Sequence, residues 1–269
     1  MTTASASGRT AHRAIRRNLP RLYLLETKYE FLKLWRLRAY SLSTLVFPVM
    51  FYVIIGGSFG SFSTQGLRVA AYLVACFSAV GVINAAVFAF GASVAAERGQ
   101  GWMMLKRVSP MPSSASFTAK TLMAMMFSAL VLVALSITAF VLQGVHLPLG
   151  TSLTLLATLV AGVAPFAAMG LAFGYALGPN TAPTVLNLVT MPMTFISGLY
   201  MPITQLPPFI QHVAPYLPAY HFGQLALAAI GARPMGTVVH HVIVLGAFTA
   251  VFLVAATLAY RRDEGKTYG

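Results

Sequence analysis

Long runs of apolar residues, separated by short polar segments, dominate the chain. Between Thr121 and Ala232 there is no Lys, Arg, Asp or Glu, although about 20 apolar residues are enough to cross a bilayer once as a helix. The runs do not alternate apolar and polar residues, as the strands of a membrane β-barrel would. The pattern therefore predicts an all-α polytopic membrane protein.

The apolar runs predict six transmembrane helices within a membrane domain over residues 41–260. Glycine- and proline-rich turns separate several of the runs. The expected spans are about 41–59, 69–94, 118–142, 151–177, 184–201 and 239–260. In the fourth span, Gly170, Gly174 and Gly178 follow a small-xxx-small spacing, which lets helices approach closely. We expect this face to pack within one subunit, and a dimer face is the alternative.

The segment before the first span has its own helical pattern. Residues 20–40 place apolar side chains at helical spacing, interrupted by charged ones. This predicts an N-terminal amphipathic helix in the cytoplasmic interface of the membrane, serving either as an anchor or as a docking surface for a partner. Residues 1–19 are polar and basic, and we expect them to be disordered. Residues 261–269 would form a cytoplasmic tail.

An apolar but proline-rich stretch precedes the last span. Five prolines between positions 202 and 218 interrupt any continuous helix. Irregular backbone at membrane depth is tolerated only where protein or a cavity covers it. We therefore expect residues 203–230 to form re-entrant or extracytoplasmic short helices, with an amphipathic surface loop as the alternative.

The distribution of positive charge predicts the orientation. Nine Lys and Arg precede the first span, four lie between the second and third spans, and three follow the last, whereas the other side has only Arg68 and Arg233. The positive-inside rule then places both termini in the cytoplasm of a cell-membrane protein. The formal net charge of +13 is explained by contact with anionic membrane lipids, so no nucleic-acid partner is expected.

Catalytic and cofactor motifs are missing from the sequence. It has no G-x-x-x-x-G-K-[ST] phosphate loop, no nucleophile elbow and no paired carboxylates. His240 and His241 are adjacent and are expected to be solvated near the outer interface rather than to bind a metal. No expected span contains Asp or Glu, which coupled carriers use as relays. The chain is therefore expected to be no enzyme and to bind no cofactor, and any energy would come from another polypeptide.

The 95–116 segment is the one long cytoplasmic loop expected between spans. Its core, WMMLKRV at 102–108, can form a short amphipathic helix that Pro110 and Pro112 end. Such a helix fits a groove in a partner. The alternative is a basic loop that only sets topology.

Two motifs of this sequence are specific enough to compare with known families. The first is in the 95–116 loop, and the second, S-G-x-x-x-P-x-x-x-L-P, begins at the end of the fifth span. The residues of the first are Glu97, Arg98, Gly101, Leu105, Lys106, Arg107, Pro110, Met111 and Pro112. Those of the second are Ser197, Gly198, Pro202, Leu206 and Pro207, followed by Pro215 and Pro218. Together they resemble the motifs of ABC-2-type permeases, the membrane subunits of ATP-binding-cassette exporters. The resemblance covers about residues 20–262 and is greatest to the drug and antibiotic exporters, although lipid-linked polysaccharide exporters share the length and layout.

This resemblance implies partners and roles for particular residues. The permease would pair with a second copy or a paralogous permease, on two separate ATPase subunits that bind ATP and Mg²⁺. The helix at 20–38 would also touch the ATPase. The loop would couple ATP-driven motion through Glu97, Arg98, Gly101, Trp102, Leu105, Lys106 and Arg107.

An amphiphilic or hydrophobic cargo would pass along Asn84, Thr190, Thr194, Phe195, Ser197 and Tyr200. The re-entrant exit would include Gly198, Pro202, Pro207, Pro215 and Pro218. A stand-alone channel and a non-transporting scaffold are the alternatives, and interhelical hydrogen bonding is the alternative for each polar pathway residue.

Overall fold

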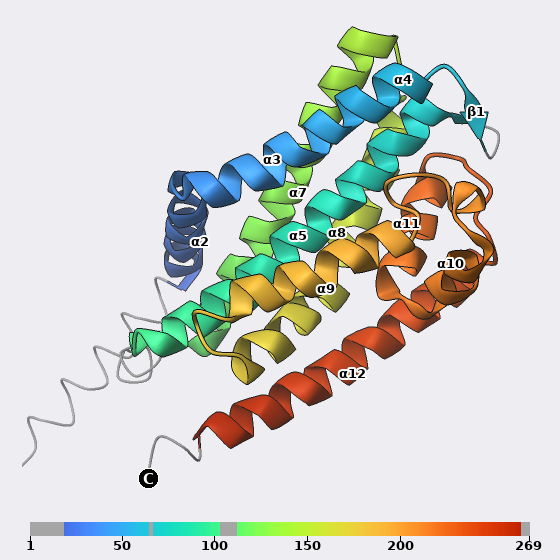
Figure 1. Cartoon of the computed structure of the whole chain (residues 1–269). Coiled ribbons are helices and arrows are strands. Elements are labelled where there is room, and N and C mark those ends of the chain that lie inside the picture. Colours follow the sequence, from blue (N-terminus) through green and yellow to red (C-terminus); the bar gives the residue numbers. More distant parts are fainter. Residues whose placement is uncertain (1–18, 65–66, 103–111, 265–269) are drawn as a thin grey trace, which may run out of the picture.

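Helices make up nearly all of the part of the chain that the computed structural model describes, which is residues 19–64, 67–102 and 112–264 (Figure 1). A two-stranded antiparallel hairpin lies between the helix that ends at Phe59 and the helix that begins at Val69. In it, β1 (Ser63–Thr64) pairs with β2 (Leu67–Arg68). The principal helices are α2 (Leu19–Arg36), α3 (Arg38–Phe51), α5 (Val69–Gly99), α7 (Ser113–Gln143), α8 (Leu149–Ala176), α9 (Ala182–Ile196), α11 (Pro218–Ala229) and α12 (Val238–Glu264).

Five helices in the described residues are long and apolar enough to cross a membrane. They are Tyr40–Phe59, Val69–Gly99, Ser114–Gln143, Leu149–Ala176 and Val238–Arg262. The expected count of six is not confirmed, because the fifth predicted span forms only the 15-residue α9. At 1.5 Å per residue, α9 is about 22 Å long, less than the roughly 30 Å of bilayer hydrocarbon. The apolar run continues to Met201, but the helix ends where Gly198 adopts a left-handed conformation, with φ of +77°.

The long helices run roughly antiparallel, with α5 in the middle of the bundle and α12 on its outside (Figure 1). The composition of α5 explains its place, since a helix that is apolar on all sides is normally buried. Within an apolar stretch of 18 residues of α5, 89% is buried, compared with 11% in the corresponding stretch of α12. The central position of α5 means that a displacement of this helix reaches most of the bundle.

Close packing between α5 and α8 depends on glycine. A Cβ atom added at Gly170 would lie 2.7 Å from the Val87 carbonyl oxygen, and one at Gly174 would lie 2.9 Å from the Gly91 carbonyl oxygen. These two positions therefore pack within the subunit, as expected from their spacing. Gly178 lies beyond the end of α8.

The first membrane helix is interrupted near the hairpin by a π-helical turn, η1 (Tyr52–Gly56), and ends with α4 (Gly57–Phe59). The Tyr52 hydroxyl donates a hydrogen bond of 3.0 Å to Oε1 of Gln143, at the end of α7. Nη2 of Arg68 donates to the Gln143 carbonyl oxygen at 3.3 Å. These two bonds connect the first membrane helix and the start of α5 to the end of α7 at one end of the molecule.

Short helices joined by proline-led turns connect α9 to α12. They are η2 (Ile203–Gln205), α10 (Pro208–Val213), η3 (Ala214–Tyr216) and α11. Proline stands in the first turn or at the N-cap of each, where its missing N–H costs no helical hydrogen bond. Of these helices, α11 is the most buried, and it packs against α5, α8 and α12. That the segment is re-entrant in a membrane stays a prediction.

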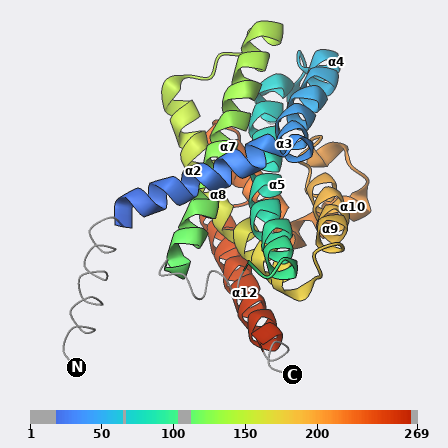
Figure 2. The ribbon, with the colours of Figure 1, turned by 90° about the vertical axis from the view of Figure 1, so that its left-hand side faces the viewer.

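The N-terminal helix α2 lies across the long helices rather than along them (Figure 2). Phe31 contacts Phe127 of α7, with ring centroids 5.3 Å apart, and Trp35 lies 6.3 Å from the same ring. Leu24, Leu25 and Tyr29 are exposed. One side of α2 is thus bound to the bundle and another carries apolar side chains outward, an arrangement compatible with the interfacial helix that the sequence predicts.

Candidate functional site

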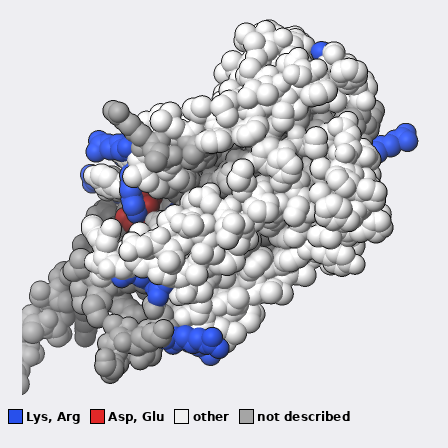
Figure 3. Space-filling model, in the orientation of Figure 1, with Lys and Arg blue, Asp and Glu red and all other residues white. Residues whose placement is uncertain are grey.

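Basic side chains gather at one end of the molecule (Figure 3). This end is formed by α2, the last turn of α5, the first turns of α7 and the last turn of α12, which includes Arg261 and Arg262. Arg68 and Arg233 lie at the hairpin and after α11, away from this end. The positive-inside rule predicts that this end faces the cytoplasm, and the orientation stays a prediction.

Four charged side chains form a cluster at this end, which we call the ion cluster: Glu30 and Lys33 of α2, Glu97 of α5 and Lys120 of α7. Lys120 Nζ lies 2.7 Å from Glu97 Oε1 and 3.1 Å from Glu30 Oε1. Lys33 Nζ lies 3.2 Å from Glu97 Oε1 and 3.5 Å from Glu30 Oε2. Lys120 also donates to the hydroxyl of Ser93 at 2.7 Å. Three helices are therefore joined through two carboxylates and two ammonium groups.

Three of the four members of the ion cluster are buried, and the Lys33 side chain remains half exposed. Lys120 is 3% exposed and Glu97 is 8% exposed. Burial opposes the charge of Lys33, but attraction to Glu30 and Glu97 outweighs it and raises the pKa of Lys33. Lys33 therefore stays charged at neutral pH. Among the described side chains, two negative groups face two positive groups, and such pairing is what buried charges require.

Of the first two predicted coupling residues, Glu97 is buried and Arg98 is half-buried. Glu97 belongs to the ion cluster. Nη1 of Arg98 donates to the carbonyl oxygens of Gly174, at 2.7 Å, and Leu177, at 3.2 Å. Its guanidinium carbon lies 5.9 Å from the centroid of the Tyr175 ring. A cation that binds the last carbonyls of a helix also meets the negative end of the helix dipole. Glu97 and Arg98 thus connect the end of α5 to α2, α7 and α8.

The rest of the coupling motif lies beyond α5. Gly101 has a left-handed φ of +71°, which turns the chain after the helix. Trp102 is 53% exposed. Leu105, Lys106 and Arg107 fall outside the described residues. Sequence reasoning missed Lys120, which it grouped with the loop charges although the residue falls within the third predicted span. A lone lysine inside a span was the signal that could have identified it.

The predicted pathway residues divide into two groups. The Thr190 hydroxyl donates to the Leu186 carbonyl oxygen at 2.7 Å, and that of Thr194 to the Thr190 carbonyl oxygen at 2.9 Å. These local bonds favour a structural role for both. Ser197 is buried, and its hydroxyl has no partner among the described residues. Asn84, midway along α5, is half-buried.

Phe195 and Tyr200 belong to an aromatic group. Their rings stack with centroids 5.1 Å apart, and Phe195 is 47% exposed. Tyr200 meets Phe51 edge-on at 5.5 Å and Phe77 edge-on at 5.6 Å. The structure therefore joins the end of α9 to α3 and α5 through aromatic contacts. The sequence analysis did not single out Phe51 or Phe77, because only the fold brings them to Tyr200.

The predicted exit residues lie around the turns after α9. The carbonyl oxygen of Gly198 accepts a hydrogen bond of 2.9 Å from the Tyr72 hydroxyl. Pro202 and Pro218 are buried, while Pro207 and Pro215 are exposed. Each proline begins or precedes one of the short helices. These residues fix the path of the chain between α9 and α12.

A buried histidine pair joins α11 to α12 beside this region. Nδ1 of His221 lies 2.8 Å from Nδ1 of His241, which is only 1% exposed. The expectation that His241 is solvated is therefore wrong, because α11 covers it, whereas His240 is exposed. No group of three or more His, Cys, Asp or Glu able to hold a metal occurs in the described part of the chain.

The bond between the two rings needs a hydrogen on one Nδ1 atom and a lone pair on the other. Nε2 of His221 also contacts the Pro215 carbonyl oxygen at 2.8 Å, and Nε2 of His241 contacts that of Met235 at 3.1 Å. Protonating both rings would place a hydrogen on each Nδ1 atom and would break the bond between them.

We expect acidification to weaken the contact between α11 and α12. Burial and the nearby His240 lower the pKa of His221 below its ordinary value of 6.5, against the opposing effect of the Pro215 carbonyl. A lowered pKa in the folded state means that stability is present above about pH 6.5 and is lost as the pH falls below it. Thermal unfolding of the purified protein at pH 7.5 and 5.0 should differ by on the order of a few degrees.

The control for this prediction is a second histidine. In His221→Gln the difference between the two pH values should shrink, whereas in His212→Gln, which changes an exposed histidine of α10, it should persist. Equal pH dependence in all three proteins would contradict the role of the pair.

The bundle, with five helices long enough to span and one strongly basic end, is that of a multi-pass membrane protein. The model of the ABC-2 type transporter family matches residues 21–230. The chain belongs to this family.

Two curated proteins are similar to the chain. A protein of Bacillus subtilis (strain 168) named as transport permease YvfS is 24% identical over 242 residues, covering 87% of this chain and 95% of that protein. Nodulation protein J of Rhizobium leguminosarum bv. viciae is 38% identical over 77 residues, covering 28% of this chain and 30% of that protein. Permeases of this family are transport subunits rather than enzymes, and they work with ATPase subunits in ABC transporters.

Proposed function

We propose that the chain is the permease subunit of an ABC exporter that moves an amphiphilic or hydrophobic cargo outward. Two separate ATPase subunits would supply the energy, and a second copy or a paralogous permease would complete the pathway. Both termini would be cytoplasmic. The observation that carries the proposal is the ion cluster, because it binds the end of the central helix α5 to α2 and α7 beside the coupling motif.

The ion cluster supports coupling through its rigidity. A force applied to the segment after Gly101 would enter at the end of α5, which is tied to α2 and α7 through Glu97 and to α8 through Arg98. The exposed indole of Trp102 is the described side chain best suited to enter a groove in the ATPase, since buried tryptophans often dominate such interfaces. Glu97 and Arg98 would then transmit the motion without touching the partner.

The exposed face of α9 supports pairing of two permeases. Leu188, Met191 and Phe195 are all exposed and recur at positions i, i+3 and i+7, so they share one face. The aromatic group of Phe195 and Tyr200 borders this face. An uncharged pathway between two such faces suits a cargo with a large apolar part.

The test is co-purification of an ATPase from native membranes in mild detergent. The wild-type protein should bring down ATP hydrolysis and a subunit of ATPase mass. Scrambling residues 102–109, which leaves Glu97 and Arg98 intact, should abolish it. Trp102→Ala should weaken it by roughly thirtyfold, as expected for an interface tryptophan worth about 2 kcal/mol.

Phe62→Ala is the matched control, since Phe62 is an exposed aromatic residue in the hairpin at the other end. The Phe62→Ala variant should co-purify as much ATPase as the wild-type protein. An ATPase that stays bound to the scrambled variant would refute docking at this loop. If the folded wild-type protein co-purifies with no ATPase, the result would favour a stand-alone channel or a non-transporting scaffold.

A further inference from the structure

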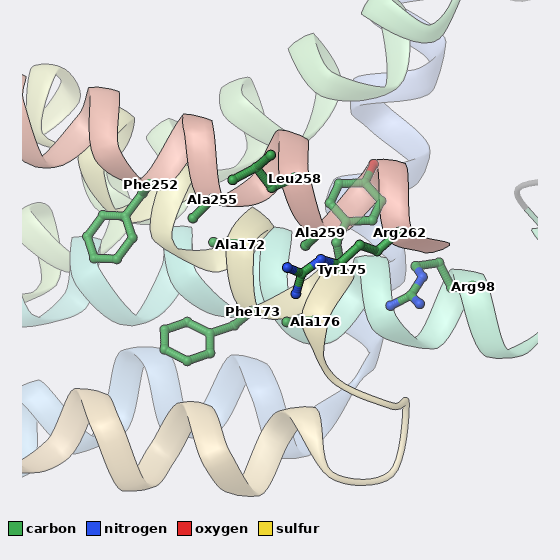
Figure 4. Close-up of a pocket in the computed structure, with 10 residues that line it drawn as sticks. All are labelled: Arg98, Ala172, Phe173, Tyr175, Ala176, Phe252, Ala255, Leu258, Ala259 and Arg262. Carbon is green, nitrogen blue, oxygen red and sulfur yellow. The ribbon is translucent and has the colours of Figure 1, made fainter. Parts of the chain in front are cut away.

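A cavity of about 620 Å³ opens between α8, α12 and the end of α5 (Figure 4). Its volume falls within the range of about 300–1,000 Å³ that is typical of small-molecule sites. Its lining includes Arg98 and Arg262, the aromatic residues Phe173 and Phe252, and small residues such as Ala255. None of these residues belongs to the predicted cargo pathway, and only Arg98 belongs to the coupling motif.

The cavity is amphipathic along its length. Arg98 and Arg262 lie toward one end, and Phe173 and Phe252 lie toward the other (Figure 4). Small and apolar side chains line the stretch between them, and the lining within the described part of the chain includes no acidic residue. A ligand that fits must therefore combine a negatively charged group with an extended apolar part.

The two arginines are held in different ways. Nη1 of Arg98 bonds the last carbonyls of α8, which fixes the guanidinium at the mouth of the cavity. Arg262 is exposed in the last turn of α12. Two guanidinium groups from different helices can converge on one phosphate, which arginine binds through charge-assisted hydrogen bonds.

The position of the cavity selects the source of the ligand. Its basic end lies at the end of the molecule where Lys and Arg gather, and its apolar part extends between two membrane helices. Basic pockets between membrane helices on the cytoplasmic side bind anionic headgroups. A lipid in the same leaflet presents its phosphate and its acyl chain in this order.

We propose that this cavity binds one anionic phospholipid, with its phosphate at Arg98 and Arg262 and an acyl chain along Ala255 toward Phe252. The lipid contacts α8 and α12 together. Because α12 is the least buried of the five long helices, the bound lipid strengthens its attachment to the bundle. The site does not depend on the identity of the exported cargo.

The test measures lipid binding to the purified, delipidated full chain by native mass spectrometry. Phosphatidylglycerol should bind at one molecule per chain and raise the thermal midpoint, whereas phosphatidylcholine with the same acyl chains should bind about tenfold more weakly. Arg262→Gln should lower the affinity for phosphatidylglycerol about tenfold. Arg261→Gln removes the same charge from the neighbouring residue, which does not line the cavity, and should leave the affinity unchanged.

A second pair of variants tests the acyl-chain part. Ala255→Trp fills the cavity and should reduce phosphatidylglycerol binding with both arginines present. Ala250→Trp places the same bulk on an exposed position of α12 outside the cavity and should not. Equal losses in Arg261→Gln and Arg262→Gln, full binding in Ala255→Trp, or stabilisation by inorganic phosphate as large as that by phosphatidylglycerol would each overturn the lipid site.

Discussion

Replacing Lys120 by methionine is expected to destabilise the protein by about 3–5 kcal/mol, because it leaves a buried charge without its partner. Lys120 is the most buried member of the ion cluster and contacts both Glu30 and Glu97. Without it, Lys33 is the cation of the ion cluster that remains to face the two carboxylates. The expected result is a loss of the contact between α2, α5 and α7, seen as a lower free energy of unfolding in detergent micelles.

Two further variants make this prediction specific. Lys28→Met removes the same charge from an exposed position of α2 and should change stability little. Glu97→Met combined with Lys120→Met leaves the Glu30–Lys33 pair and should recover most of the loss, since a balanced pair can often be replaced by apolar residues. A single Lys120→Met variant as stable as Lys28→Met would show that the cluster contributes nothing to stability.

Replacing Gly174 by valine is expected to separate α5 from α8. Even the first added carbon would lie 2.9 Å from the carbonyl oxygens of Phe90 and Gly91. These are backbone atoms of the most buried helix, so they cannot rotate away as a side chain can. We expect a loss at the upper end of the roughly 1–3 kcal/mol that overpacking costs. Thermal unfolding monitored by size-exclusion chromatography measures it.

Gly246→Val is the control, since a Cβ atom at Gly246 of α12 meets nothing within 4 Å. This variant should remain as stable as the wild type. If Gly174→Val instead dissociated a dimer and left the thermal midpoint of the subunit unchanged, the glycine face would be an interface between copies.

The long helices could be predicted closely from hydropathy. The expected spans 69–94 and 239–260 correspond to Val69–Gly99 and Val238–Glu264, because the length of an apolar run determines whether a helix can cross a bilayer. The fifth span could not be delimited in this way. Leu199, Tyr200 and Met201 extend the apolar run, and only the backbone conformation at Gly198 shows that the helix has already ended.

The role of Glu97 could not be read from its neighbours along the chain. The motif around Glu97 predicted a side chain that acts on a partner, and it gave no sign of contacts with other helices of the same chain. Glu97 instead meets Lys33, 64 residues earlier, and Lys120, 23 residues later. Local pattern cannot distinguish a carboxylate in contact with water from one in contact with a lysine of another helix.

The sequence by itself determined the helical class, the position of most membrane helices and the basic end of the molecule, because each follows from hydrophobicity and charge along the chain. The tertiary structure alone decided the ion cluster, the His221–His241 pair and the cavity between α8 and α12. These features depend on distances between side chains of different helices, and such distances are set by helix packing rather than by spacing in the sequence.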